Sequence, residues 1–429
     1  MTTYDWIVVG AGITGAALAY ELAKQGFSTL LLEQHNPLTG ATRYSYGGIA
    51  YWSGTTALTR QLCAEGIERH RILSAELEAD TQFRELDLLL TIAAHSDPQA
   101  LVQQYASFAI PPHLLSVAEA CGLEPLLNPT AIAGALTVRH GHIEVELTTQ
   151  AYCQAMQRLG GNFKIAQVTG FVKEGASRIT GVTTTIGPLH AANIAICTGG
   201  ITRQLLQESG IRVKQYFTHA EIIETPPTDL RLSTLVMPAA AERFQLEADA
   251  TQPEVEDLWN EPGHEPAPAI LDAGAIQFLD GRIRIGQTSR TLTDPKATIA
   301  ASQSEADLRT KISAILPAIG KLPGTWHHCT IAFSRDRLPL VGAIPAIEGI
   351  HLFSGFSNPL AIVPAIARRF AASLTGENDE IIEQLSPGRF NVNSMKFLAT
   401  IANPETPPWP PNSGEIGVQS PPELGDLGG

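Results

Sequence analysis

The segment from Tyr4 to Glu33, YDWIVVGAGITGAALAYELAKQGFSTLLLE, constrains the chain most because it predicts a complete βαβ unit. An apolar strand precedes Gly10, Gly12 and Gly15, which stand at GxGxxG spacing, and an Ala/Leu-rich helix and a second apolar strand follow. Such glycines allow a tight turn, close approach of backbone amides to a pyrophosphate, and packing of the helix on the strand. Glu33 stands where a carboxylate accepts hydrogen bonds from a ribose hydroxyl. The unit therefore predicts a dinucleotide site at a helix N-terminus.

Length and charge exclude several classes of protein. A chain of 429 residues with 44% hydrophobic residues exceeds what one core usually organises, so two or more domains are expected. The net charge of -14 argues against a nucleic-acid partner. Five scattered cysteines without CxxC spacing indicate neither a disulfide framework nor a zinc site.

The ends of the chain carry two further expectations. The first strand begins almost at the N-terminus, which leaves no room for an export signal, so we expect a cytoplasmic protein. No apolar run approaches the ~20 residues that span a bilayer, so no transmembrane segment is expected. From Pro387, and especially from Pro404, the chain is rich in Pro, Gly and Ser, and we expect a disordered tail.

Between these ends the periodicity changes several times, which predicts an interleaved fold. Residues 55–80 and 148–159 are expected to be helical, and residues 83–90 and 213–223 to form strands. Asp280-Gly281 separates two alternating apolar segments and predicts a tight hairpin.

Four blocks, in this order, resemble the FAD-dependent D-amino acid oxidase superfamily, particularly its glycine oxidase and sarcosine oxidase-like branch. They are GAGITG with Glu33, GATRYSYGGIAYW at 40–52, NIAICTGG at 193–200, and IAFSRDRLPLVGAIP at 331–345 with the GIHLFSGFSNPL segment that follows. The last block, with Asp336, Pro339 and Gly342, is the most specific. The resemblance covers most of residues 1–376 and implies FAD in preference to NAD.

The resemblance also implies the fold. We expect an α/β protein in which a Rossmann-like FAD-binding domain is interleaved with an α+β substrate domain that contains a mixed antiparallel sheet. The expected FAD-binding segments are 1–80, 145–212 and 325–386, the substrate-domain segments are 81–144 and 213–324, and the tail is 387–429.

The glycine unit and the resemblance together predict the site. The expected catalytic residues are Arg284, Tyr46 and His328. The expected cofactor-binding residues are Gly10, Gly12, Ile13, Thr14, Gly15, Glu33, Gln34, Thr42, Arg43, Gly47, Gly48, Val168, Thr198, Gly199, Cys329, Gly355, Phe356, Ser357, Asn358, Pro359 and Leu360.

The turn at Gly355 is expected to lead into a helix from Pro364 to Leu374. A helix N-terminus there suits the negative charge of a reduced flavin; the alternative is a structural turn in the core. The resembling sarcosine oxidases carry a lysine after this turn that pairs the substrate carboxylate, whereas this chain has the aliphatic run 360–363. Glycine and sarcosine are therefore expected to be poor substrates.

A carboxylate would then need an arginine from elsewhere. Arg43 is one candidate, although a contact to FAD phosphate explains it equally well. Arg284 is the other, although it shares a strand face with Arg282 that could be solvated. Aromatic residues of the second block could wall an amine pocket or pack in the core: Tyr44, Tyr46, Tyr51 and Trp52.

Cys329 precedes Asp336 by seven positions, a spacing similar to that of oxidases that hold FAD covalently through a cysteine. The neighbouring His327 and His328 would favour its thiolate. A buried inert thiol is the preferred alternative. Adjacent histidines on a strand face opposite sides, so a metal site is not expected.

These features predict an FAD-dependent oxidoreductase that transfers a hydride from the carbon of an amine or amino acid to flavin N5. Dioxygen or a separate acceptor would reoxidise the flavin. Oxidation of a 2-hydroxy acid on the same scaffold and a non-catalytic flavin-binding partner protein remain alternatives. The sequence leaves the oligomeric state open.

Overall fold

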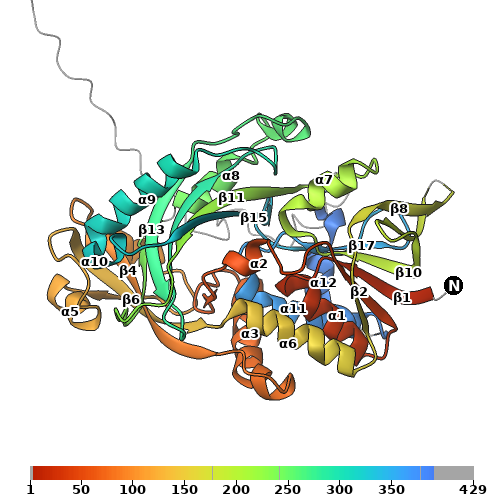
Figure 1. The fold of residues 1–429 in the computed structure, drawn as a ribbon, viewed down its shortest axis with the longest axis horizontal. Helices are drawn as coiled ribbons and strands as arrows, with labels where there is room; N and C mark the ends of the chain where they lie inside the picture. The colour runs from red at the N-terminus through yellow and green to blue at the C-terminus, as the bar shows by residue number, and fades with distance from the viewer. Residues whose placement is uncertain (1–2, 176, 241, 377, 391–429) are drawn as a thin grey trace, which may run out of the picture.

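The computed structural model describes residues 3–390 except 176, 241 and 377, and these residues form two sheets, called sheet A and sheet B here (Figure 1). Within the described residues sheet A has eight strands: β1 (Thr3–Val9), β2 (Thr29–Glu33), β7 (Asn162–Ile165), β8 (Val168–Glu174), β9 (Arg178–Thr184), β10 (Leu189–Ile196), β16 (Leu340–Ala343) and β17 (Ile350–Ser354). Sheet B has nine: β3 (Gly48–Ile49), β4 (Arg84–Ala93), β5 (His113–Leu115), β6 (Ile132–His142), β11 (Gln215–Glu224), β12 (Leu235–Pro238), β13 (Ile270–Gln277), β14 (Ile283–Arg290) and β15 (Thr325–Ser334).

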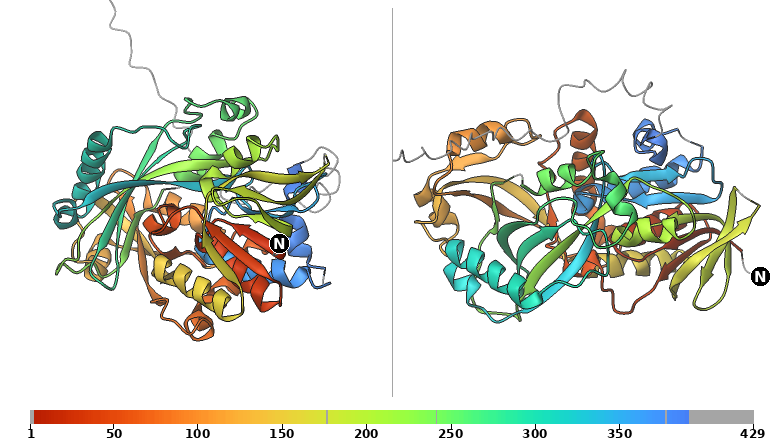
Figure 2. Two further views of the ribbon diagram at one scale, coloured as in Figure 1. Left: turned by 45° about the vertical axis from the view of Figure 1, so that its right-hand side comes forward. Right: turned by 90° about the horizontal axis from the view of Figure 1, so that it is seen from above.

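The helices connect and cover these sheets (Figure 2). Their bounds are α1 (Ile13–Lys24), α2 (Ala41–Tyr44), α3 (Ala57–Glu76), α4 (Pro98–Tyr105), α5 (Val117–Leu123), α6 (Val145–Arg158), α7 (Thr202–Gln207), α8 (Glu242–Asp249), α9 (Ala301–Ile315), α10 (Pro317–Gly320), α11 (Pro359–Ser373) and α12 (Glu380–Gln384). Short 3-10 helices occupy Gly199–Ile201 (η1), Glu256–Asn260 (η2) and Pro387–Phe390 (η3).

Sheet A has the order β16-β17-β10-β1-β2-β7, and the five strands from β17 to β7 run parallel. Parallel strands are buried on both faces, which explains the continuous apolar runs of β1 and β2. Helices α1, α3, α6 and α11 pack on one face, and the β8–β9 hairpin and α7 cover the other. The predicted βαβ unit is β1, α1 and β2.

Sheet B has the order β15-β11-β14-β13-β12-β4-β6-β3 and is mostly antiparallel. The hairpin predicted at Asp280-Gly281 joins β13 to β14 and is confirmed by their antiparallel pairing. Helices α5, α9 and α10 pack on one face through a cluster that includes Leu308 and Ile312. The expected α/β class with a second, mixed antiparallel sheet is confirmed.

The structure corrects the expected placement of residues 325–334 and the expected start of the last long helix. Residues 325–334, expected in the FAD-binding domain, form β15 of sheet B, because they pair along their whole length with β11. Helix α11 begins at Pro359 and not at Pro364, because proline fits the first turn of a helix, where its missing N–H has no partner to lose. The aliphatic run 360–363 is therefore buried helix.

The expected tail begins too early. The guanidinium of Arg389, in η3, is buried and donates two hydrogen bonds of 2.8 Å to the Asp336 carboxylate. Its Nη1 atom donates to the carbonyl oxygen of Pro339 at 3.1 Å. Residues 387–390 thus belong to the folded domain, and Asp336 of the fourth block holds them. The rest of the expected tail, 391–429, lies outside the described residues.

Among the described helices, none is both long enough and apolar enough to cross a bilayer.

Helices α3 and α11 meet at Gly66. A Cβ atom built on Gly66 would lie 1.7 Å from the carbonyl oxygen of Ala361, so the two helices can approach this closely only through a glycine. The imidazole Nε2 of His70, one turn further along α3, lies 2.6 Å from the carbonyl oxygen of Leu360. This crossing fixes the start of α11.

We predict that Gly66→Ala lowers the free energy of unfolding by about 1–3 kcal/mol, because the methyl group forces the helices apart. Gly122→Ala is the matched control, since Gly122 also lies in a helix but has open space around its Cβ position. There the alanine should be neutral or stabilise by up to about 1 kcal/mol. Denaturant unfolding measures both, and equal effects would contradict the proposed crossing.

Candidate functional site

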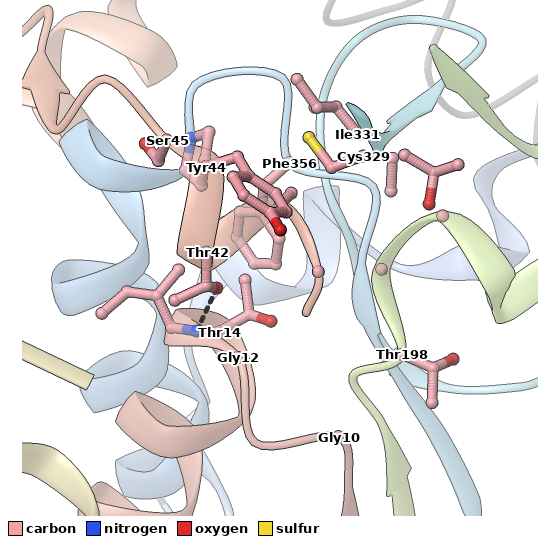
Figure 3. Close-up of a pocket in the computed structure, with 18 of the residues that line it drawn as sticks. Gly10, Gly12, Thr14, Thr42, Tyr44, Ser45, Thr198, Cys329, Ile331 and Phe356 are labelled. Atoms are coloured by element: carbon pink, nitrogen blue, oxygen red, sulfur yellow. Dashed lines mark hydrogen bonds between the residues drawn. The ribbon is translucent and has the colours of Figure 1, made fainter. Parts of the chain in front are cut away.

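A cavity of about 870 Å³ lies between the two sheets. Four parallel strands of sheet A end at it: Gly10 follows β1, Glu33 ends β2, Thr198 follows β10 and Gly355 follows β17. Ligands of open α/β sheets bind outside the carboxyl ends of such strands. Figure 3 shows Gly10, Gly12 and Thr198 on this side of the cavity, with Cys329 and Ile331 of sheet B across from them.

The glycine unit forms the turn that its spacing predicts. Gly10 has a φ of +99°, and a Cβ there would lie 2.7 Å from the carbonyl oxygen of Cys197. A Cβ on Gly15 would lie 1.9 Å from the carbonyl oxygen of Gly10, so α1 packs directly on this turn. Gly12 is the N-cap of α1 and provides no side-chain cap. The N-cap residue itself therefore brings no side chain that competes for the backbone amides of the first turn.

Thr42 closes this turn from the second sequence block. Its hydroxyl accepts a hydrogen bond from the Ile13 amide at 3.0 Å, which Figure 3 marks as a dashed line. A Cβ on Gly12 would lie 2.9 Å from the same hydroxyl. Thr14 also lines the cavity here.

Glu33 is held by backbone donors at the end of β2. Its Oε2 atom accepts from the Ala11 amide at 2.8 Å, and its Oε1 atom accepts from the amides of Gln34 and His35 at 2.9 and 3.1 Å. The carboxylate lines the cavity and retains free lone pairs. It is thus oriented to accept hydrogen bonds from a ribose.

The fourth block gives a second helix N-terminus at the cavity. Gly355 has a φ of +76° and turns the chain from β17 toward α11, whose N-cap, Asn358, makes no side-chain cap. The buried hydroxyl of Ser357 has no partner among the described residues and lines the cavity. Free amides and a free hydroxyl at one point can stabilise an anion or a carbonyl oxygen.

Sheet B supplies the opposite wall. Side chains alternate along a strand, and Ala220 pairs with Cys329 across β11 and β15, so these residues face the same side. The residues that sheet B contributes, called the sheet B wall, are Gly48, Leu88, His140, Ala220, Ile222, Leu235, Met237, Gln287, Cys329, Thr330, Ile331 and Ala332. No carboxylate is among these described residues, and most are apolar.

His140 is a neutral donor in this wall. The indole Nε1–H of Trp52 donates to its Nδ1 at 3.0 Å, and an indole nitrogen can only donate. Burial lowers the pKa of His140 to about 3, so the ring is neutral and carries its proton on Nε2. A Cβ on Gly48, another lining residue, would lie 2.6 Å from Nε2. His140 therefore offers a fixed N–H beside the Tyr46–Gly48 loop.

Tyr46, predicted as a catalytic residue, lines the cavity. Its hydroxyl is buried and has no partner among the described residues. Burial raises its pKa far above the ordinary value, so it remains a neutral phenol. A Cβ on Gly286 would lie 2.8 Å from this hydroxyl and 3.0 Å from the carbonyl oxygen of Glu221, so glycine leaves room for both.

The structure gives Arg43 and Arg284 a different role from the one expected. Both guanidinium groups bind Glu224: Arg43 donates two hydrogen bonds of 3.0 and 2.8 Å, and Nε of Arg284 donates one of 2.8 Å. Arg284 also donates to the carbonyl oxygen of Ser45 and is fully buried. Neither Arg43 nor Arg284 is among the described residues that line the cavity. Their charge is used within the protein because Glu224 lies between them.

His328 faces away from the cavity. It pairs with Glu221 across β11 and β15 and therefore shares the outer face of sheet B. Its ring stacks on His219 at 4.6 Å, and Glu221 beside them accepts hydrogen bonds from Ser304 of α9 and from Arg290. The residue expected to be catalytic therefore belongs to a buried network that holds α9. Strand alternation places its neighbour Cys329, and not His328, at the cavity.

Cys329 lines the cavity, but its environment differs from the one expected. Burial raises the pKa of its thiol to about 12, so the neighbouring histidines do not produce a thiolate. His327 stacks on Tyr44 at 4.7 Å and is not a lining residue. The inert-thiol alternative is the one that this environment favours.

The remaining predicted residues fall into two groups, those that line the cavity and those that do not. Gly15 and Gly47 pack beneath the site and do not line it, and Tyr51 and Trp52 also lie outside the lining. Predicted residues that do line the cavity are Gly10, Gly12, Ile13, Thr14, Glu33, Gln34, Thr42, Tyr44, Tyr46, Gly48, Val168, Thr198, Gly199, Cys329, Gly355, Phe356, Ser357, Asn358, Pro359 and Leu360.

Sequence reasoning missed several polar lining residues, among them His140, Arg243, Gln287 and Lys296. His140 and Gln287 stand on strands whose partners no local pattern identifies. Arg243 stands on α8, within the polar segment between two predicted strands. The sequence offered one weak signal for Arg243: it is an arginine in a polar segment between two strands predicted for the substrate domain.

By fold and site, the chain is a dinucleotide-binding α/β protein whose cofactor site is closed by a second sheet. The model of the FAD dependent oxidoreductase family, DAO, matches residues 5–373. The chain belongs to this family and is an FAD-dependent oxidoreductase. The expected family and cofactor are confirmed.

Individual relatives are distant but extend over the whole fold. The uncharacterized oxidoreductase YurR of Bacillus subtilis is 24% identical over 409 residues, which cover 89% of this chain and 97% of the relative. Glycine oxidase of Pseudomonas aeruginosa is 24% identical over 395 residues, with 86% and 94% covered. The crystal structure of glycine oxidase from Geobacillus kaustophilus superposes with a TM-score of 0.72 at 19% identity and covers 91% of this chain and 99% of that one.

The residues of the cavity fit FAD. The uncapped turn at Gly12 can hold a pyrophosphate, and Glu33 can hold a ribose. The unpartnered hydroxyl of Ser357 and the uncapped start of α11 can bind the polar edge of a flavin. FAD, when bound, supplies the acceptor for a hydride.

We predict that Glu33→Gln weakens FAD affinity about tenfold to a hundredfold, because it removes a charged acceptor from the ribose site. Asp5→Asn is the matched control: Asp5 also accepts a backbone amide, that of Ser28 at 2.8 Å, but does not line the cavity. Titration of apoprotein with FAD measures both. Equal affinities in wild type and Glu33→Gln would contradict the ribose assignment.

A second prediction concerns acid stability. The pKa of His140 is about 3 in the folded protein and about 6.5 in an unfolded chain, so below pH 6.5 only the unfolded chain binds this proton. Stability from this group is complete above pH 6.5 and falls by about 1.4 kcal/mol per pH unit toward pH 3.

His140→Gln should therefore reduce the slope of the unfolding free energy against pH between pH 6 and 4. The expected reduction is about 1.4 kcal/mol per pH unit, which corresponds to one proton. The control is His95→Gln, because solvent surrounds that exposed ring in both states. An unchanged slope in His140→Gln would show that the ring is not held neutral.

Proposed function

We propose that this protein oxidises an amine or amino acid by transfer of a hydride from the carbon that bears the nitrogen. The observation that carries the proposal is the absence of a proton acceptor in the described sheet B wall. His140 is neutral with its Nδ1 already occupied, burial raises the pKa of Cys329 to about 12, and the wall has no carboxylate.

This absence favours an amine over a 2-hydroxy acid. When an alcohol is oxidised, its hydroxyl proton must pass to a base positioned within hydrogen-bond reach. An amine can enter as the free base, with its proton already lost to solvent, and its lone pair assists departure of the hydride. An amine therefore needs from the wall only orientation and exclusion of water.

The lining residues match those two tasks. Apolar side chains such as Ile222, Leu235 and Met237 exclude water from the reacting carbon. The phenol of Tyr46, the Nε2–H of His140 and the amide of Gln287 provide neutral hydrogen-bonding groups that orient a polar substrate without competing for its proton.

We further propose that the substrate is bulkier than glycine or sarcosine. The segment 360–363 is part of α11, where Leu360 lines the cavity and all four side chains are buried and uncharged. A small amino acid whose nitrogen and carboxylate both lie beside the start of α11 would leave that carboxylate without a cation, which is costly.

The test is anaerobic reduction of the holoenzyme, followed by loss of flavin absorbance. The panel pairs primary and N-substituted amino acids with the 2-hydroxy acids of the same side chains, and includes glycine and sarcosine. We expect several bulky amino acids to reduce the flavin at least about tenfold faster than glycine, sarcosine or any hydroxy acid. Reduction by the hydroxy acids alone would support the alternative chemistry. No reduction by any compound would favour a non-catalytic role, and rapid turnover of glycine would contradict the size argument.

A further inference from the structure

We propose that Arg243 of α8 binds a carboxylate of the substrate, so that the substrate class is an amino acid and not a simple amine. This proposal rests on the proposed amine oxidation and specifies its substrate. Figure 1 shows α8 beside sheet B, where it contacts β13. Arg243 lines the cavity from that side.

Arg243 differs from the other arginines near the site because most of its hydrogen-bonding capacity is unused. Among the described residues, neither terminal nitrogen of its guanidinium has a hydrogen-bond acceptor, and its buried Nε atom faces only Glu247. Its one ion pair, to Oε1 of Glu247, spans 3.4 Å from Nε. Arg43 and Arg284, by contrast, bind Glu224 at 2.8–3.0 Å. The forked end of Arg243 is therefore available for a bidentate anion.

The charges around Arg243 also favour an added anion. Glu247 is buried, and burial raises its pKa, which weakens it as a counter-ion. Asp272 also interacts electrostatically with Arg243, and burial together with Glu242 raises the pKa of Asp272 to about 6. A substrate carboxylate would complete the compensation of the guanidinium inside a largely apolar cavity.

The location agrees with the aliphatic start of α11. Arg243 comes from the sheet B side, whereas Leu360 comes from the sheet A side of the same cavity. A carboxylate at Arg243 lies across the cavity from the start of α11. Such a substrate must reach from the reacting carbon toward α8, which selects a longer or N-substituted amino acid.

The experiment compares acid and amide forms of one ligand, which separates charge from shape. The dissociation constants of phenylacetate and phenylacetamide are measured from the change in flavin absorbance of the oxidised holoenzyme, which requires no turnover. We expect wild type to bind the acid more tightly than the amide. Arg243→Met should raise the dissociation constant of phenylacetate by about ten- to a hundredfold and change that of phenylacetamide by less than about twofold.

Two further variants make the result specific. Arg243→Lys keeps the charge but loses the fork and should recover only part of the acid affinity. Gln245→Met, on the exposed side of the same helix, should change neither ligand and tests whether α8 itself is perturbed. FAD content and thermal unfolding confirm that each variant is folded.

Equal binding of acid and amide by wild type, or an equal loss of both in Arg243→Met, would overturn the proposal. With any amino acid that reduces the flavin, Arg243→Met should raise KM about ten- to a hundredfold and change kcat much less, because it removes binding of a remote group. Failure of the whole amine panel would refute the proposed reaction but leave the ligand comparison valid, so the two failures are distinguishable.

Discussion

The ion-pair cluster at Glu224 holds the two halves of the site together. Its carboxylate, at the end of β11, accepts from Arg43 of α2, from Arg282 just before β14, and from Arg284 of β14. Burial by itself would raise the pKa of Glu224, but hydrogen bonds from Arg43 and Arg284 outweigh it and lower that pKa to about 2. Loss of one member of such a buried cluster leaves uncompensated charge. The loop that carries Tyr46 and Gly48 is thus fixed against sheet B.

The two sheets contribute different kinds of chemical groups to the cavity. Sheet A contributes backbone: uncapped helix starts, glycine turns and a carboxylate held by amides, all of which suit a large charged cofactor. Sheet B contributes apolar and neutral polar side chains that suit a smaller molecule. The charged network of Glu221, Arg290 and Ser304 lies on the outer face of sheet B, so it stabilises the packing of α9 without placing charge in the cavity.

The separation of charge has a chemical consequence. A cavity with neutral groups beside the reacting atoms favours the uncharged amine, and a single free guanidinium on its periphery can orient an acid without disturbing the reaction. Because Arg43, Arg282 and Arg284 are bound to Glu224, the cations that remain in the lining on the sheet B side of the cavity are Arg243 and the exposed Lys296. Specificity would then depend on α8, which lies outside the cofactor side of the cavity.

The sequence alone determined the cofactor half of the protein. Glycine spacing and the acid at position 33 act over a few residues, so local rules suffice to predict them. The same holds for the Asp280-Gly281 hairpin of sheet B. The tertiary structure alone decided which side chains face the cavity. The pairing of β11 with β15 put Cys329 inside and His328 outside, since a shift of one residue exchanges the faces of a strand. Long-range contacts likewise place Arg284 in a hydrogen bond with Glu224, and the packing of α8 on β13 places Arg243 at the cavity. No sequence pattern encodes such partners, because they are hundreds or tens of residues apart and are chosen by the packing of the whole fold.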